Sequence, residues 1–205
     1  SEYGVNITLK SLFDKKLISK ESIKVIFDIG CHKGEWTEDI KSLLPVSVIH
    51  QFDAVNYKKK KYQNVFFHEA CLGEKNQSSF FYQRKESGDS LFKEKGNLYS
   101  KEDKVKVEVK TLDYLLEEKK IKSPDYLKID AQGAELCILN GGINSIKKTS
   151  FIQLEVSYIE YNEGGCLFEE VLPYMRSIKF NPIAFSHIKG QDHRIIQSDI
   201  LFQKF

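Results

Sequence analysis

The sequence alternates between two patterns of apolar and polar positions. Runs dense in β-branched, aliphatic and aromatic residues are typical of strands, and strands covered on both faces need few polar positions. Such runs predict strands at residues 23–29, 47–54, 64–72, 125–131 and 151–157. A shorter alternating run predicts a strand at 105–112, and two closing strands are predicted at 181–187 and 199–205.

Between these runs, apolar residues recur every three or four positions, which is the spacing of one helix face. This spacing predicts helices over residues 8–19, 35–44, 111–120, 135–146 and 167–178. The predicted inward faces include Leu17 in the first helix and Ile143 in the fourth. Pro173 is expected to interrupt the last helix.

Strands that alternate with helices predict an α/β fold built on a doubly wound parallel sheet, because parallel strands are joined by right-handed crossovers. Ligands bind such sheets at the carboxyl ends of the strands. We expect residues 1–205 to form one domain, with residues 1–22 as an N-terminal helical extension. The polar stretch 83–104 is the one long irregular segment and is interpreted as a lid or substrate loop.

The composition is that of an ordinary globular protein, with 41% apolar and 29% charged residues. A net charge of +2 gives no field that would attract nucleic acid, so no nucleic-acid partner is expected, and the lysine run at 56–63 is interpreted as a solvated helix face. The cysteines lack metal-site or disulfide spacing and are interpreted as reduced thiols in a cytoplasmic protein. No apolar stretch approaches the roughly 18 to 20 residues of a membrane helix, so no membrane span is expected.

The stretch VIFDIGCHKGEW, residues 25–36, ends a buried strand with an acidic residue and continues into a turn with two glycines. Asp28 would stand at the carboxyl end of the strand, while Gly30 and Gly34 would let the backbone approach a ligand at the helix N-terminus. Their spacing does not match the G-x-G-x-x-G of nicotinamide-binding proteins. Asp53 ends the next strand, 19 residues after Gly34, where a carboxylate can accept hydrogen bonds from ribose hydroxyls. These features predict a nucleoside bound without a diphosphate; the alternatives are a cap or turn at Asp28 and a plain strand-end turn at Asp53.

Five stretches resemble, in order, the FkbM-type S-adenosylmethionine-dependent methyltransferases. They are VIFDIGCHKGE (25–35), VKTLD (109–113), YLKIDAQGAELCILNGG (126–142), QLEV (153–156) and DILF (199–202). The resemblance spans residues 23–205 and implies a Rossmann-like class I methyltransferase sheet, mostly parallel with an antiparallel C-terminal strand. The chain departs from the family pattern at Cys31 and His32, where members often have Ala-Asn, and at residues 52–54, where they often have Phe-Glu-Pro.

The same resemblance implies S-adenosylmethionine as the cofactor and assigns its contacts by position. The residues implied are Asp28, Gly30, Cys31, His32, Gly34, Thr37, Asp53, Ala54 and Ala70.

The resemblance further implies O-methylation of a hydroxyl on a sugar, glycan or secondary metabolite. A hydroxyl acceptor must lose its proton, which calls for a general base or a metal ion. Asp130 and Glu155, near the ends of neighbouring strands, are candidate bases and could together hold a divalent cation such as Mg²⁺; Asp130 could instead cap the following helix.

Residues on two loops complete the predicted site. His187 and His193 lie between the closing strands, and His187 is the candidate base of the two, the alternative being a solvated loop histidine. Ser90, in the long polar loop, is a candidate substrate contact. Glu135 is interpreted as structural, favouring a helix N-terminus.

Three other functions match parts of the pattern. A nicotinamide-dependent oxidoreductase would share the fold but needs the glycine motif that is missing here. A non-catalytic nucleoside-binding module would need only the donor site. A nucleic-acid methyltransferase would need a basic surface or stacking aromatic residues.

Overall fold

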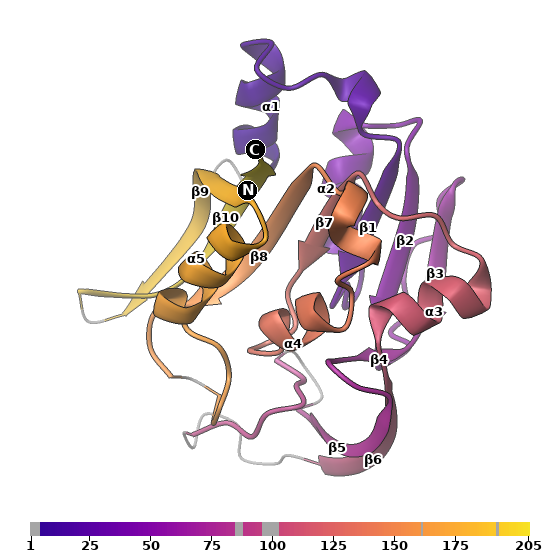
Figure 1. Cartoon of the computed structure of the whole chain (residues 1–205), viewed down its shortest axis with the longest axis vertical. Helices are drawn as coiled ribbons and strands as arrows, with labels where there is room; N and C mark the ends of the chain where they lie inside the picture. Colours follow the sequence, from indigo (N-terminus) through magenta and orange to yellow (C-terminus); the bar gives the residue numbers. More distant parts are fainter. Residues whose placement is uncertain (1–4, 85–87, 96–102, 161, 192) are drawn as a thin grey trace.

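A seven-stranded sheet in the order β3-β2-β1-β7-β8-β10-β9 forms the centre of the computed structural model (Figure 1). The structure describes residues 5–84, 88–95, 103–160, 162–191 and 193–205. The parallel strands are β1 (Val25–Ile29), β2 (Val48–Asp53), β3 (Val65–Glu69), β7 (Tyr126–Ile129) and β8 (Phe151–Ser157). β10 (Arg194–Lys204) is antiparallel to β8, and β9 (Phe180–Gln191) is antiparallel to β10. The predicted mostly parallel sheet with an antiparallel C-terminal strand is confirmed.

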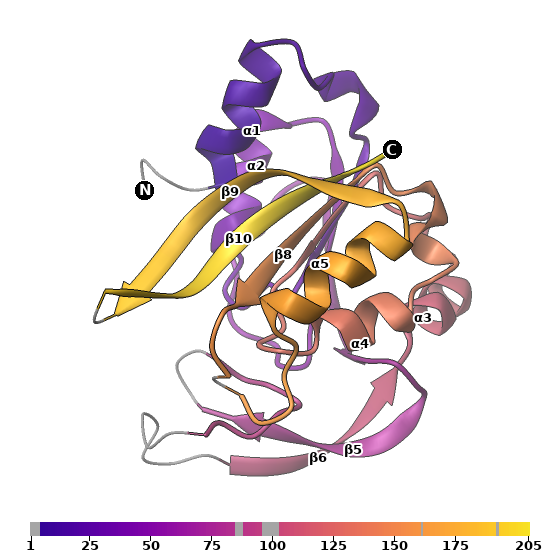
Figure 2. The same cartoon turned by 60° about the vertical axis from the view of Figure 1, so that its left-hand side comes forward.

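Helices cover both faces of this sheet (Figures 1 and 2). α1 (Val5–Asp14) and α2 (Glu35–Leu43) pack on one face; α3 (Leu112–Lys119), α4 (Glu135–Asn140) and α5 (Phe168–Ser177) pack on the other. Successive strand residues point to opposite faces, so Ile26 enters the core under α1 and α2 while Phe27 enters the core under α3 to α5. β1 is apolar at most positions because both of its faces are covered, and the fold is doubly wound as predicted.

A second, three-stranded sheet lies beyond the carboxyl ends of the main strands (Figure 2). It consists of β4 (Cys71–Leu72), β6 (Asp103–Lys110) and β5 (Gln77–Gln83), in that order. The prediction of one strand over 64–72 is wrong at its end, because the Ala70 N–H bonds to the Asp53 carbonyl and the chain then leaves the main sheet to pair with β6. β5 was not predicted: only Phe81 of its residues is buried, so its sequence carries little apolar signal.

Two polar segments lie next to the small sheet: the lysine run at 56–63 and the loop predicted over 83–104. The lysine run at 56–63 forms no helix and follows an irregular path. In the loop predicted over 83–104, residues 84 and 88–95 connect β5 toward β6, and Ser90 pairs with Tyr82; residues 85–87 and 96–102 of that loop lie outside the described residues.

Three helix predictions are corrected by the packing. α1 ends at Asp14, which leaves Leu17 65% exposed while Ile18 is buried. α4 ends at Asn140 and a turn follows, so Ile143 is 40% exposed; Gly141 packs so closely on Gly73 that a Cβ there would lie 2.1 Å from the Gly73 carbonyl oxygen. α5 continues through Pro173, with a buried apolar residue on each side of the proline, Val171 and Met175. The other short helices are η1 (Lys20–Ser22) and η2 (Ser145–Lys148).

All four cysteines carry free thiols. Among the helices of the described ranges, none combines the length and the apolar character needed to cross a membrane.

Candidate functional site

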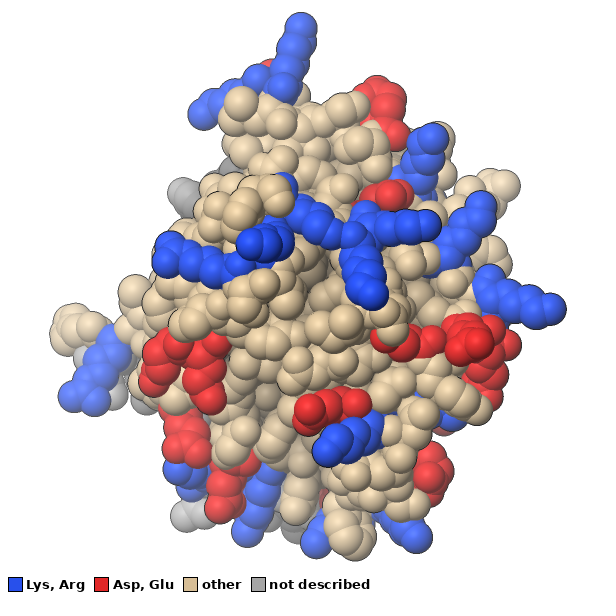
Figure 3. Space-filling model, in the orientation of Figure 1, with Lys and Arg blue, Asp and Glu red and all other residues tan. Residues whose placement is uncertain are grey.

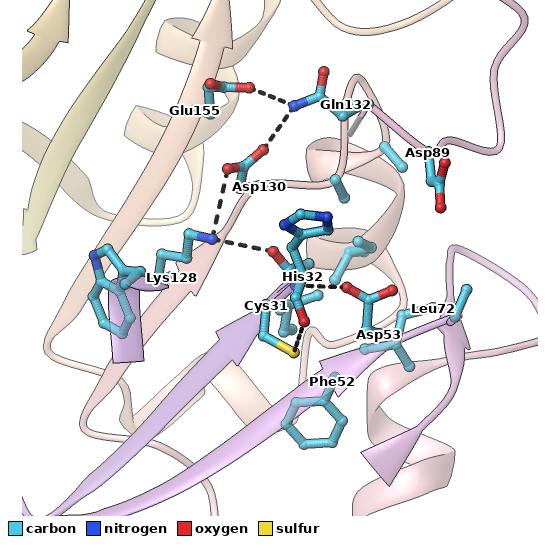
Figure 4. A pocket seen from close by; sticks show the side chains of 18 of the residues that line it. Cys31, His32, Phe52, Asp53, Leu72, Asp89, Lys128, Asp130, Gln132 and Glu155 are labelled. Atoms are coloured by element: carbon cyan, nitrogen blue, oxygen red, sulfur yellow. Dashed lines mark hydrogen bonds and ion pairs between the residues drawn. The ribbon is translucent and has the colours of Figure 1, made fainter. Parts of the chain in front are cut away.

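A cavity of about 510 Å³ opens at the carboxyl edge of the main sheet, a size typical of sites for small organic ligands (Figure 4). Its walls come from β1, β2, β7, β8, β9 and β10 and from the small sheet. The predicted site residues that line it are Gly30, Cys31, His32, Asp53, Ala54, Ala70, Asp130, Glu155 and His187. Asp28, Gly34, Thr37 and Ser90 do not line it.

Asp53 places a carboxylate at the end of the cavity that β2 and the small sheet enclose. Its Oδ2 accepts the His32 backbone N–H at 2.8 Å and its Oδ1 accepts the Val55 N–H at 3.0 Å. Burial raises the pKa of this carboxyl group, against the lowering effect of these two hydrogen bonds. The surrounding wall is largely apolar and includes Phe52, Ala54, Cys71, Leu72 and Phe81. The carboxylate is therefore held in one orientation beside a pocket suited to a flat apolar group.

The turn after β1 combines two left-handed residues. Gly30, at φ +73°, packs against the backbone of Asp130 with no room for a side chain. His32 has φ 47°, and its ring meets Tyr57 edge-on at 4.5 Å between centroids. The His32 Nε2 atom is buried and has no hydrogen-bond partner. A buried polar atom without a partner at a cavity wall indicates a place where a ligand supplies one.

Asp28 is fully buried behind the cavity wall and forms an ion pair with Lys128. Its Oδ2 accepts the Thr37 hydroxyl at 2.7 Å, and its Oδ1 lies 3.2 Å from the Lys128 ammonium. Lys128 also donates to the Gly30 carbonyl at 3.3 Å and lies 3.6 Å from Asp130 Oδ2. Burial would lower the pKa of Lys128, but the carboxylates of Asp28, Asp130 and Asp199 together hold it above its usual value. Asp28 and Thr37 thus build the floor of the site without reaching its interior.

Asp130 and Glu155 are brought together, as predicted, and Gln132 lies between them (Figure 4). The Gln132 amide donates to Asp130 Oδ1 at 2.9 Å and to Glu155 Oε2 at 2.8 Å. Burial and the neighbouring Asp130 raise the pKa of Glu155 to about 8, whereas Lys128 overcomes burial and lowers the pKa of Asp130. The two carboxyl groups therefore differ in proton affinity, which is higher at Glu155 than at Asp130.

The donor set around these two carboxyl groups does not fit a divalent cation. Oδ1 of Asp130 and Oε2 of Glu155 face the Gln132 amide, Oδ2 of Asp130 faces Lys128, and Oε1 of Glu155 accepts from Lys189 at 2.7 Å. Each oxygen that a metal ion would need is thus already opposite an N–H donor. Within the described ranges, no group of three or more potential ligands is arranged for a metal ion.

His187, predicted at the end of a strand where a loop begins, lies well within β9, which continues to Gln191; β10 begins at Arg194, so the predicted loop between the closing strands is wrong over most of its length. Its Nδ1 lies 2.8 Å from Asp199 Oδ2. Asp199 was not predicted, because only the antiparallel pairing of β9 with β10 reveals that it faces His187. His193 is exposed at the turn between these strands and does not line the cavity.

Two more predicted residues have structural contacts. The buried Ser90 hydroxyl donates to the Gln132 carbonyl at 2.8 Å and accepts the Phe92 N–H at 3.0 Å, so it ties the loop to the turn after β7; its neighbour Asp89 lines the cavity instead. Glu135 accepts the N–H groups of Ala131 and Gly133, at 2.9 and 3.1 Å, and stabilises the same turn. The N-cap of α4 is Ala134, so Asp130 does not cap this helix.

The comparisons with known proteins agree with this geometry. The sequence matches the family model described as the methyltransferase FkbM domain over residues 28–182. No curated protein matches the sequence.

Solved structures show the same fold. The methyltransferase FkbM from Methylobacillus flagellatus KT superimposes with a TM-score of 0.52 at 13% identity, covering 87% of this chain and 44% of that one. A putative hemolysin from Lactococcus lactis superimposes with a TM-score of 0.51 at 13% identity, covering 100% of this chain and 88% of that one. A putative ribosomal RNA methyltransferase from Plasmodium falciparum superimposes with a TM-score of 0.50 at 14% identity, covering 98% of this chain and 96% of that one. The chain spans less than half the length of the Methylobacillus protein, and identities this low establish the fold alone.

Proposed function

The chain belongs to the FkbM methyltransferase family, and on that basis we propose that it transfers the methyl group of S-adenosylmethionine to a hydroxyl group of a sugar, glycan or secondary metabolite. The observation that carries the donor half of this proposal is Asp53. Its carboxylate is fixed by two backbone N–H groups at the carboxyl end of β2, beside an apolar pocket. That combination suits a ribose whose hydroxyls meet the carboxylate while the adenine lies against the apolar wall.

The turn after β1 would hold the amino-acid part of the donor. Gly30, Cys31 and His32 line the cavity between Asp53 and Asp130, and the unpartnered His32 Nε2 can contact the donor carboxylate. The bound cofactor supplies a methyl group on a sulfonium, whose departing thioether is neutral and needs no acid. The protein's main task is then to hold donor and acceptor in line.

The opposite end of the cavity is polar, which favours a hydroxylated acceptor. Asp130, Gln132, Glu155, His187 and Lys189 present charged and hydrogen-bonding groups there. An apolar acceptor would exclude water from these groups and leave their remaining hydrogen-bonding capacity unmet, at a cost of about 1–3 kcal/mol for each group so desolvated.

Two rival functions are less well supported. The turn after β1 lacks the glycine spacing of nicotinamide-binding proteins. A nucleic-acid methyltransferase would want a continuous basic surface, but on the face shown in Figure 3 basic and acidic side chains are interspersed in both the upper and the lower half. The lysines that line the cavity, Lys128 and Lys189, are each paired with carboxylates of the site.

The test is a calorimetric titration with S-adenosylhomocysteine. We expect the wild type to bind and Asp53→Ala to bind at least about tenfold more weakly, a loss of about 1.4 kcal/mol. Asp125→Ala is the matched control, because Asp125 also accepts two backbone N–H groups, from Lys24 and Val25 at 2.8 and 2.9 Å, but at the amino edge of the sheet. Binding of NADH instead of S-adenosylhomocysteine, or equal binding by both variants, would contradict the proposal.

A further inference from the structure

The polar end of the cavity holds three candidate bases, and their surroundings separate them. Asp130 faces the Lys128 ammonium, which stabilises its ionised form and makes it a weak proton acceptor. Glu155 is enclosed by the donors Gln132, Lys189 and Gln197, which already occupy both of its carboxyl oxygens. Neither carboxyl group is well placed to accept a proton.

His187 differs from both because one ring nitrogen is fixed and the other is left open. Its Nδ1 contacts Asp199 at 2.8 Å, whereas Nε2 has no hydrogen bond with any residue of the described ranges. The side chain is 35% exposed and lines the cavity. An Nδ1–H held by a carboxylate leaves the Nε2 lone pair to a substrate.

The backbone is irregular at His187, which lines the cavity. The register between β9 and β10 shifts next to Asp199, and His187 has φ 47° at that irregularity. A bulge of this kind re-aims a side chain, and a non-glycine residue held in the left-handed region costs about 1–3 kcal/mol.

Asp199 is held from behind by a chain of buried groups. Its Oδ2 also accepts the Gln153 amide at 3.0 Å, and Gln153 Oε1 accepts the Tyr126 hydroxyl at 2.6 Å. Tyr126 and Gln153 are both buried, so the orientation of Asp199 is set by the sheet itself.

We propose that His187 Nε2 takes the proton of the acceptor hydroxyl and that Asp199 is the positioning residue that holds its imidazole. This inference rests on the proposed methyltransferase function. The acceptor oxygen forms a bond to the methyl carbon, the electrons of the carbon–sulfur bond go to sulfur, and the hydroxyl proton moves to Nε2. The resulting imidazolium is stabilised by Asp199 on its other side.

Four charged groups face His187 and set its titration. They are Asp199 on β10, Lys189 on β9, Asp39 on α2 and, through Lys189, Glu155 on β8. The hydrogen bond from His187 to Asp199 raises the pKa of the imidazole and outweighs burial. The neutral, proton-accepting form therefore predominates only at pH values above this raised pKa.

The experiment is an NMR titration of the full chain labelled with ¹⁵N-histidine, with S-adenosylhomocysteine or S-adenosylmethionine bound and no acceptor present. We expect neutral His187 to carry its proton on Nδ1. We also expect its pKa to be about half a unit lower with S-adenosylmethionine, because a sulfonium near the ring disfavours the imidazolium. A role confined to holding the strands together would not respond to the charge on the donor.

Variants separate the contributions, with the exposed His193 as the internal reference. Asp199→Asn should remove the preference for the Nδ1–H tautomer and lower the pKa of His187. Asp39→Asn should keep that tautomer, since no hydrogen bond joins it to His187. An Nε2–H tautomer in the wild type, or identical titrations with both ligands bound, would overturn the inference alone. Failure of both ligands to bind would overturn the proposed function with it.

Discussion

Gly30 and Asp130 approach so closely that a Cβ atom on Gly30 would lie 1.8 Å from the Asp130 carbonyl oxygen. The contact joins the ends of β1 and β7 at the rim of the cavity, and the Asp130 N–H bonds to the Ile29 carbonyl beside it. These two strand ends hold both the turn after β1 and the Asp130 carboxylate.

The first prediction follows from this contact. Gly30→Ala should lower the free energy of unfolding by about 3 kcal/mol or more, because backbone must move and a left-handed φ of +73° is strained for alanine. Gly34→Ala is the control: its φ is also positive, but its Cβ would meet the Gln51 side-chain nitrogen at 2.9 Å, and that side chain can move. Urea denaturation should rank Gly30→Ala well below Gly34→Ala, and the reverse order would contradict the role given to this contact.

Lys128 should be needed for stability, most of all near neutral pH. Lys128→Met removes the cation between Asp28 and Asp130 and should cost about 3–5 kcal/mol at pH 7. Without the cation, the folded-state pKa of Asp130 should rise, so stability is lost as pH rises through it and the deficit is smaller near pH 5. Urea denaturation at both pH values measures this, with the exposed Lys122→Met as a control that should change little. A deficit equal at both pH values would argue against electrostatic compensation.

Glu155 should make the wild type less stable as the pH rises. Its folded-state pKa is raised to about 8, so the folded protein keeps a proton that the unfolded chain releases. Stability is therefore lost as pH climbs from the unfolded pKa toward the folded one. Glu155→Gln should remove this slope and gain about 1 kcal/mol or more relative to wild type between roughly pH 5 and 8. Chemical denaturation across that range tests it, and Glu169→Gln, an exposed position on α5, should keep the wild-type slope.

Ser90 should contribute to stability rather than contact the substrate directly. Ser90→Ala removes a buried hydroxyl that both donates to Gln132 and accepts from Phe92, and should cost about 1–3 kcal/mol in the free energy of unfolding. Ser79→Ala, at a half-buried position of β5, is the comparison and should change stability by less than about 0.5 kcal/mol. Equal thermal stability of the two variants would show that the Ser90 hydroxyl bonds do not hold the loop.

The sequence was sufficient for the main sheet and for the acids at its carboxyl edge. Strands buried on both faces leave long apolar runs, and Asp53 and Asp130 directly follow such runs. β5 was missed because it buries little beyond Phe81, and the end of α4 was missed because the apolar spacing continues past Asn140 to Ile143 and Ile146.

Residues whose roles depend on partners from distant strands could not be predicted in the same way. Lys128 gains its role from Asp28 on β1, and Asp199 from His187 across the β9–β10 pairing. Periodicity identifies which residues are buried, but not which buried polar groups meet. For Lys128, the alternate spacing with Asp130 on one strand was an available signal, since both side chains point to the same face.

The strand order has a consequence for synthesis of the protein. β10 lies between β8 and β9 in the sheet although it follows both in the sequence. During synthesis β8 and β9 leave the ribosome before β10, the strand that lies between them in the sheet. Until β10 has emerged, β9 cannot form its final strand pairing. The cavity wall that carries His187 and Asp199 is thus closed only after residues 194–204 have emerged, and no shorter nascent chain can hold the completed site.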